Sequence, residues 1–199
     1  MNAELRKQRQ YRVGSIAPAA PGEGEKGPEG IIAGTAILFD TVTQLEPGVF
    51  EKIDPRAADS ALLRGDDVRC LFNHDVNYVM ARLSAGGLRL WKETDGLHFE
   101  AQLDPEISWQ RDLWRQVSAG VINQCSFGFD ILKERREEVE GGELYIIQDI
   151  YLYDVALVTF PAYIDTSAEA RSNNRAPMPA AAPGMDPALT YLMAEIAVK

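Results

Sequence analysis

The stretch that most constrains this chain is residues 124–132, where apolar and polar side chains alternate. A period of two is typical of a β-strand with one face on a core. The side chains predicted to face that core are Cys125, Phe127, Phe129 and Ile131. Ser126 then lies on the opposite face and is predicted to be exposed. Its same-face neighbour Gly128 would let another backbone approach the hydroxyl. This layout suits a nucleophile, but it also suits an ordinary surface serine beside a glycine bulge.

Composition limits the classes of partner. The chain has 199 residues, with 20 basic and 30 acidic side chains and a formal net charge of −10. This length suits one folded unit with tails. The negative charge repels phosphate backbones and anionic lipids, so we expect neither nucleic acid nor membrane as a partner. No segment has the character of a secretory signal or a membrane span, which predicts a protein that stays in a cytosol.

Cysteine and histidine are scarce. Cys70 and Cys125 are the two cysteines, and in a reducing compartment they are expected to be small buried thiols. There is no pair of cysteines at metal-binding spacing, and there are two histidines. Glycine-rich nucleotide motifs are also missing. We therefore expect no metal and no cofactor.

Local composition divides the chain into three parts. Residues 1–30 are rich in Arg and Gln and then in Pro, Gly and Glu, which predicts a flexible arm, with a strand near residues 11–13. Residues 31–171 are expected to form the folded domain. Residues 172–199 are predicted to be a Pro/Ala-rich linker followed by a short amphipathic helix.

The predicted domain is β-rich. Apolar runs of strand length, separated by turn residues, are expected to form strands at 31–39, 67–72, 78–83, 87–91, 97–103 and 144–159. One short helix should start after Asp54, which can cap it, with Pro55 in the first turn. A second helix is predicted from Asp104 and Pro105 to Gly120. A charged hairpin tip is expected over residues 133–143.

Two further residues, His74 and Asp154, are candidates to act together with Ser126. His74 follows an apolar strand where the chain turns polar, and it suits either a core histidine or a base. By simple alternation Asp154 shares a face with Ile150, Leu152, Ala156 and Val158. A lone carboxylate among apolar side chains needs a partner, either a histidine or an arginine or backbone amides. Because a serine hydroxyl needs a base and the base needs orienting, the three residues suggest a triad. His98 lies on the polar face of its strand and is expected to be solvated.

These residues carry a resemblance to a known family. Residues 72–75, the run from Ser126 to Phe129 and residues 153–163 resemble, in this order, the prohead proteases of tailed bacteriophages. The likeness covers about residues 31–171. It implies an α+β fold, namely a mostly antiparallel herpesvirus-protease-like β-barrel with a few flanking helices. The resemblance also implies a serine endopeptidase that uses Ser126 as nucleophile, His74 as base and Asp154 as acid. Asp154 stands where the family often has Glu, and residues 54–58 differ from the usual Gly-Ala-Phe run.

The resemblance further implies where the enzyme acts. Its expected substrates are the phage major capsid protein, the scaffold and the chain itself, cleaved inside the prohead in the bacterial host cytoplasm. Self-association of the chain is a further possible interaction. A rival interpretation is a non-catalytic scaffold or capsid-associated β-barrel module with an inert Ser126. Another is a ligand-binding barrel walled by Trp91, Trp109 and Trp114.

Overall fold

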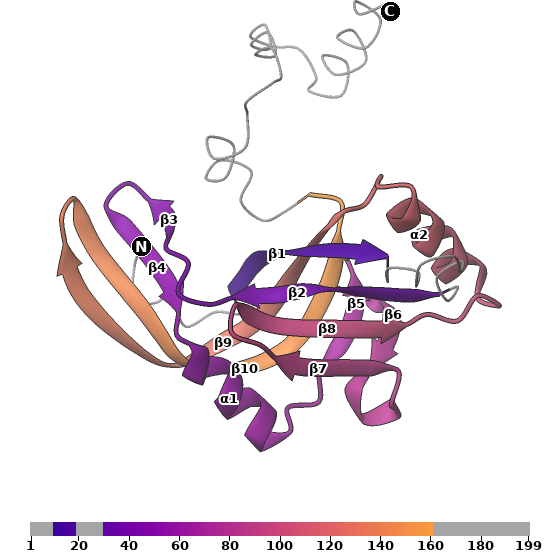
Figure 1. Ribbon diagram of the computed structural model, residues 1–199, viewed down its shortest axis with the longest axis horizontal. Helices are drawn as coiled ribbons and strands as arrows, with labels where there is room; N and C mark the ends of the chain where they lie inside the picture. Colours follow the sequence, from indigo (N-terminus) through magenta and orange to yellow (C-terminus); the bar gives the residue numbers. More distant parts are fainter. Residues whose placement is uncertain (1–9, 19–29, 161–199) are drawn as a thin grey trace, which may run out of the picture. The chain divides into compact units, whose positions relative to one another are not determined.

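The computed structural model describes residues 10–18 and 30–160. The strands are β1 (Gln10–Pro18), β2 (Ile31–Leu38), β3 (Thr43–Glu46), β4 (Val49–Ile53), β5 (Arg69–Phe72), β6 (Asp75–Arg82), β7 (Leu88–Lys92), β8 (Gly96–Gln102), β9 (Gln124–Val139) and β10 (Gly142–Val158). The helices are α1 (Pro55–Arg64), α2 (Ser108–Ser118) and the short 3-10 turn η2 (Leu83–Ala85). The domain is therefore β-rich, as predicted (Figure 1).

In the described residues, all the strands belong to one ten-stranded sheet. Its main path runs β3-β4-β10-β9-β1-β2-β8-β7, and β5 pairs with β10 while β6 pairs with β5. Most pairs are antiparallel, but β10 is parallel to both β4 and β5. Within the described residues no pairing joins the end strands β3 and β7, so the closed barrel that we expected is not shown.

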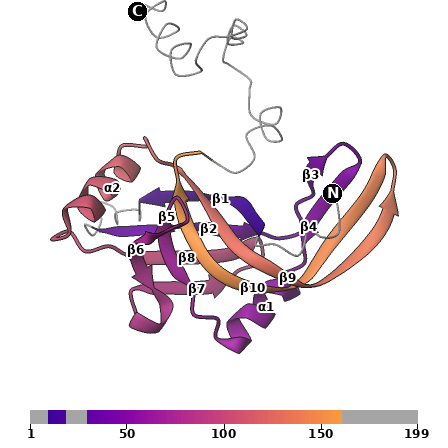
Figure 2. The same cartoon turned by 180° about the vertical axis from the view of Figure 1, so that it is seen from behind.

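The longest feature is the curved hairpin of β9 and β10 (Figures 1 and 2). Near its tip β10 pairs with β4, and near its end it pairs with β5. The tip carries charged residues, as predicted for residues 133–143. Ion pairs such as Arg136–Glu143 lie on this tip. The base of the hairpin holds Ser126 and Asp154.

The alternation predicted for the core strands is present. Cys125, Phe127 and Phe129 are buried in the main core, as are Leu97, Phe99, Ala101 and Leu103 on the β8 side. Both cysteines are buried free thiols, as expected.

The strand predicted near residues 11–13 is confirmed and spans residues 10–18, so the prediction of a flexible arm is wrong for this segment. These residues form β1, which lies between β2 and β9 inside the sheet. Arg12 and Glu51 of β4 form a buried ion pair with Nε–Oε1 and Nη2–Oε2 distances of 2.6 and 2.9 Å. The pairing of β1 with β2 and β9 extends the strand beyond the three residues that the sequence indicated. The rest of the arm and the predicted linker and helix of residues 172–199 lie outside the described residues.

The two helices differ in how well their starts were predicted. Asp54 caps α1 by accepting the Arg56 backbone N–H at 2.9 Å, and Pro55 is the first helical residue. For α2 the predicted start is wrong by several residues. The Asp104 carboxylate accepts the Glu106 N–H in a separate turn, and the helix begins only at Ser108.

Candidate active site

The turn between β5 and β6 carries the candidate base. Asn73 and His74 form a two-residue hairpin loop, and both have positive φ, 52° and 58°. Loops of this kind match the twist of the flanking strands. Asn accepts positive φ readily, whereas for His it is uncommon, and such residues cluster at functional sites. Asn at the first position of this loop is the sequence signal for the hairpin.

Asn73 fastens this turn to the end of β10. Its N–H donates to the Leu157 carbonyl at 2.8 Å, and its Oδ1 accepts the Thr159 N–H at 3.0 Å. Two bonds from one residue fix the position of the loop relative to β10. The turn therefore holds the neighbouring His74 at a set place beside that strand.

His74 and Asp154 are in direct contact. The His74 Nδ1 lies 2.5 Å from Asp154 Oδ1. The carboxylate is 2% exposed, so it needs a partner, and the imidazole supplies one. The other nearby acids are engaged elsewhere. Asp75 accepts the Asn77 N–H at 2.9 Å, and Asp149 pairs with Arg64 at 3.0 Å.

A β-bulge changes the face on which Asp154 lies. In the β9–β10 ladder Leu152 is opposite Phe129 and Asp154 is opposite Gly128, so Tyr153 is an extra residue. Our prediction that Asp154 shares a face with Ile150 and Leu152 is wrong, because the extra residue reverses the alternation. Ile150 and Leu152 belong to the main core, whereas Ala156 and Val158 pack with Leu71 in a second cluster.

Ser126 lies on the same face as Asp154. Ser126 is opposite Ala156 in the ladder, and Asp154 is two residues from Ala156. The prediction that Ser126 is exposed is wrong, since the residue is only 1% exposed. On the same face of the sheet, Leu71 of β5 is opposite Ala156, and these two residues form a second buried cluster with Val158. The Ser126 Oγ has no hydrogen-bond partner among the described residues.

The second histidine lies at a different place. His98 on β8 has Nε2 at 2.9 Å from Asp95 Oδ1 and Nδ1 at 3.2 Å from Thr35 Oγ1, and its ring stacks on Trp91. Its hydrogen bond lowers the pKa of Asp95. Glu93, Asp95 and His98 have donor atoms within 4.8 Å of one another and form the one group in residues 10–18 and 30–160 that could hold a metal ion.

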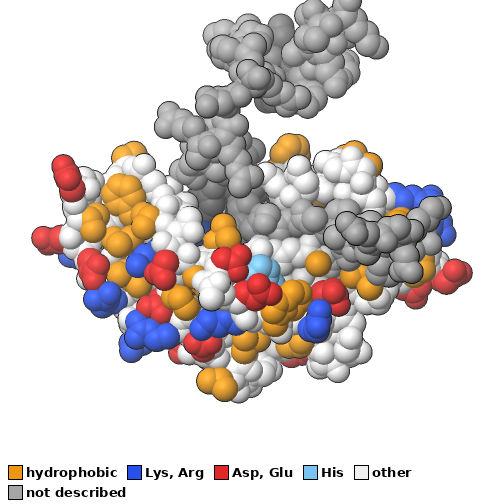
Figure 3. All heavy atoms as spheres, in the orientation of Figure 1, with side chains coloured by type: hydrophobic (Ala, Val, Ile, Leu, Met, Phe, Trp, Pro, Cys, Tyr) orange, Lys and Arg blue, Asp and Glu red, His pale blue; other side chains and the backbone are white. Residues whose placement is uncertain are grey.

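Charges near the candidate site are paired. Arg82 binds the Asp67 carboxylate and lowers its pKa. Burial, and then the Asp154 charge, raise the pKa of the Cys70 thiol, which stays neutral. Figure 3 shows acidic and basic side chains interspersed over the visible face.

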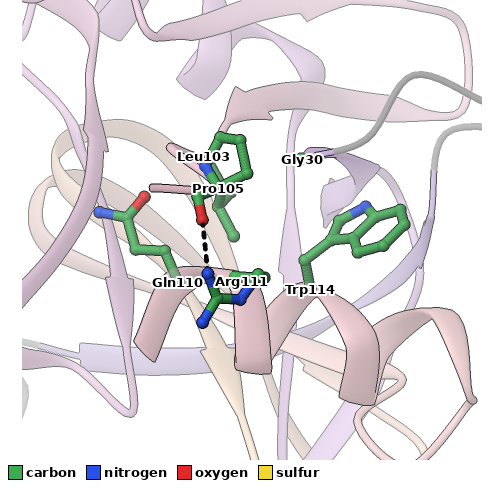
Figure 4. Close-up of a pocket in the computed structure, with 6 residues that line it drawn as sticks. All are labelled: Gly30, Leu103, Pro105, Gln110, Arg111 and Trp114. Atoms are coloured by element: carbon green, nitrogen blue, oxygen red, sulfur yellow. Dashed lines mark hydrogen bonds between the residues drawn. The ribbon is translucent and has the colours of Figure 1, made fainter. Parts of the chain in front are cut away.

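A pocket lies beside α2, and its lining includes none of His74, Ser126 and Asp154. Gly30, Leu103, Pro105, Gln110, Arg111 and Trp114 line it, and Arg111 Nη1 donates to the Pro105 carbonyl (Figure 4). Of the tryptophans proposed as walls of a ligand barrel, Trp114 alone lines this pocket. Trp109 packs edge-on against Tyr78, and Trp91 stacks on His98. The three tryptophans do not share a pocket here.

Comparisons with known proteins identify a family for most of the chain. The family model of the caudovirus prohead serine protease matches residues 20–180. Among solved structures, the fold is similar to that of the bacteriophage T4 capsid assembly protease, with a TM-score of 0.52. That match has 15% identity and covers 77% of this chain and 98% of the other. No curated protein matches the chain.

The family match defines the class of this protein as a protease, and the fold agrees with it. The chain belongs to the caudovirus prohead serine protease family, as the resemblance of its motifs indicated. In the part of the chain that the structure describes, no helix is long and apolar enough to span a membrane.

Proposed function

We propose that this chain is a serine endopeptidase in which Ser126 is the nucleophile, His74 the general base and Asp154 the acid that orients the base. The observation that carries the proposal is the His74–Asp154 contact of 2.5 Å on the sheet face that holds Ser126. A buried hydroxyl without a partner costs about 1–3 kcal/mol and calls for an explanation. The role of a nucleophile explains why the Ser126 hydroxyl has no hydrogen-bond partner here, because its function is to react with a substrate.

The ladder spacing supports a triad of these residues. Ser126 and Asp154 are diagonal neighbours across β9 and β10, and such pairs lie about 7–8 Å apart. An imidazole ring fits between two side chains at this spacing. Since Asp154 binds Nδ1, the other ring nitrogen, Nε2, is the one that accepts the proton of the Ser126 hydroxyl. This arrangement fixes the tautomer that a base needs.

The proposed reaction has two halves. Ser126 Oγ attacks the scissile carbonyl carbon as His74 Nε2 takes its proton, and His74 then gives that proton to the leaving amine as the C–N bond breaks. In the second half water attacks the acyl carbon, and His74 moves a proton from the water to Oγ. The C–Oγ bond breaks, the acid product leaves and Ser126 is restored. Asp154 stabilises the imidazolium in both halves.

The proposed substrates are proteins of the phage head. The family description names the prohead, and the T4 protein of similar fold is described as a capsid assembly protease. We propose that this chain cleaves the major capsid protein, the scaffold and itself, inside the prohead in the host cytoplasm. The net charge of −10 supports protein substrates over nucleic acid.

A fluorophosphonate probe tests the proposal. The probe forms a covalent bond only with an activated serine, so intact-mass analysis of the full chain should show one adduct. Peptide mapping should place the adduct on Ser126. The matched Ser126→Ala variant should give no adduct. Absence of labelling in folded wild-type protein that also cleaves no capsid or scaffold protein would favour the non-catalytic scaffold or capsid-associated module.

A further inference from the structure

Among the described residues, no strand pairs with one edge of β10 just before Asp154. The β4 strand pairs with β10 up to Ile147, and β5 pairs with it from Asp154 onward. On the other edge β9 runs alongside throughout. The backbone groups of residues 148–153 that point away from β9 therefore need partners other than a strand.

The last residue of α1, Arg64, and Asp66, which follows the helix, supply side chains that bind the backbone of β10 in this gap. Asp66 Oδ2 accepts the Leu152 backbone N–H at 3.0 Å, and Arg64 Nη2 donates to the Ile150 carbonyl. Arg64 also binds Asp66 through Nε–Oδ1 and Nη2–Oδ2 contacts of 3.0 and 2.9 Å. Asp66 is 5% exposed. Together the two side chains supply the donor and the acceptor that a neighbouring strand would have supplied.

The residue next to Leu152 is the bulged Tyr153. Its hydroxyl donates to Asp130 Oδ2 at 2.6 Å, so the bulge is held from the β9 side as well. The Asp66 bond fixes Leu152 immediately before the extra residue, and β5 pairing resumes at Asp154 immediately after it. The bulge is what moves Asp154 from the core face to the Ser126 face.

We propose that Asp66, held by Arg64, is a positioning residue for the active site: it fixes the bulge at Tyr153 and thereby directs Asp154 at His74. This inference rests on the proposed function for its effect on catalysis, but the positioning itself is a separate claim. Asp66 touches neither His74 nor Ser126. It acts through the backbone of β10.

The direct test observes the His74–Asp154 bond without catalysis. In the full-length Ser126→Ala protein, the Nδ1-bound proton of His74 should give a low-field proton NMR resonance, because a short charge-assisted bond holds it. The chain has two histidines, so His98→Gln assigns the signal. Asp66→Ala should remove the resonance, as Asp154→Asn does. Asp66→Asn, which keeps an oxygen acceptor for the Leu152 N–H, should restore most of it.

The matched control is Asp149→Ala. Asp149 binds the same arginine through Nη1 but does not contact Leu152. This variant should keep the resonance. In protein that keeps Ser126, the Asp66→Ala change should slow fluorophosphonate labelling by about 100-fold. This is the effect expected when a catalytic group shifts by about 1 Å. Asp149→Ala should label at nearly the wild-type rate.

The outcomes separate the two claims. An unchanged low-field resonance in folded Asp66→Ala, or equal loss in Asp149→Ala, would overturn the positioning role. Loss of the resonance in Asp66→Ala alone, with a wild-type protein that never labels, would support positioning and overturn the proposed function. If Asp66→Ala does not fold, Arg64→Gln replaces it, because this change removes the side chain that holds Asp66 and donates to the Ile150 carbonyl. A weakened resonance is expected, and an unchanged resonance in the folded variant would overturn the role of the pair.

Discussion

Leu152 and Asp154 are two residues apart on β10, yet their side chains lie on opposite faces of the sheet. Leu152 packs in the main core opposite Phe129, whereas Asp154 contacts His74 on the face that carries Ser126. An unbroken strand would place both on one face. The extra residue Tyr153 between them therefore decides whether the candidate site can form.

Ser126→Ala should abolish proteolysis, including self-cleavage, while the fold is kept. Loss of the nucleophile in a triad costs about a millionfold in turnover. Because the Oγ is buried and lacks a described partner, its removal should leave thermal stability unchanged or raised. Cleavage of a capsid-derived peptide and a melting curve measure the two effects. Wild-type cleavage by the variant would refute the role of Ser126.

His74→Asn is a sharper test of the base than an alanine variant. Asn tolerates the positive φ of this turn position, so the hairpin should fold while the base is lost. Activity should fall as far as in Ser126→Ala. The control is His98→Asn, which should retain near-normal cleavage because His98 contacts Asp95 and Thr35 instead. An inactive but folded His98 variant would mean that the base is wrongly assigned.

Asp154→Asn should keep the fold but lower turnover by up to about ten-thousandfold, because the amide no longer fixes the His74 tautomer. Asp75→Asn is the matched control, since that side chain binds only its own turn at Asn77 among the described contacts. It should be nearly as active as wild type. Steady-state cleavage at one pH measures both, and equal losses would count against Asp154.

Deletion of residues 1–18 should destabilise the domain, because β1 lies between β2 and β9 and Val13 is opposite Ser126. A point variant isolates one contribution. Arg12→Met leaves Glu51 buried without its bidentate partner, and breaking such a pair costs about 3–5 kcal/mol. Urea unfolding should show this loss, and Arg12→Met with Glu51→Leu should recover much of it. A deletion variant as stable as the full chain would contradict the structural role of β1.

The helix cap of α1 predicts a pH dependence of stability. The Arg56 side chain lowers the pKa of Asp54 from 3.8 to about 2. A folded-state pKa below the unfolded one contributes stability above pH about 4, and that contribution is lost as the pH falls toward about 2. Asp54→Asn can still cap the helix but cannot titrate. The stability difference between wild type and this variant should therefore shrink between pH 4 and pH 2 in denaturant titrations.

The local pattern of the sequence determined much of this protein. Strict alternation identified the buried face of β9 through Phe127 and Phe129, and Asp54 with Pro55 marked the start of α1. Motif order around His74, Ser126 and Asp154 was enough to indicate the family that the comparison shows. These features depend on neighbours along the chain, and so the sequence alone carries them.

Only the tertiary structure decided which residues share a face and which are covered. The bulge at Tyr153 is bound by Asp66 and Asp130, which lie outside β10, and the sequence of β10 contains no signal for it. Ser126 is buried, although the alternation of its strand predicted an exposed face. Likewise β1 is ordered by β9, β2 and Glu51 rather than by its own composition. Each outcome depends on contacts between segments distant in sequence, which a local period cannot encode.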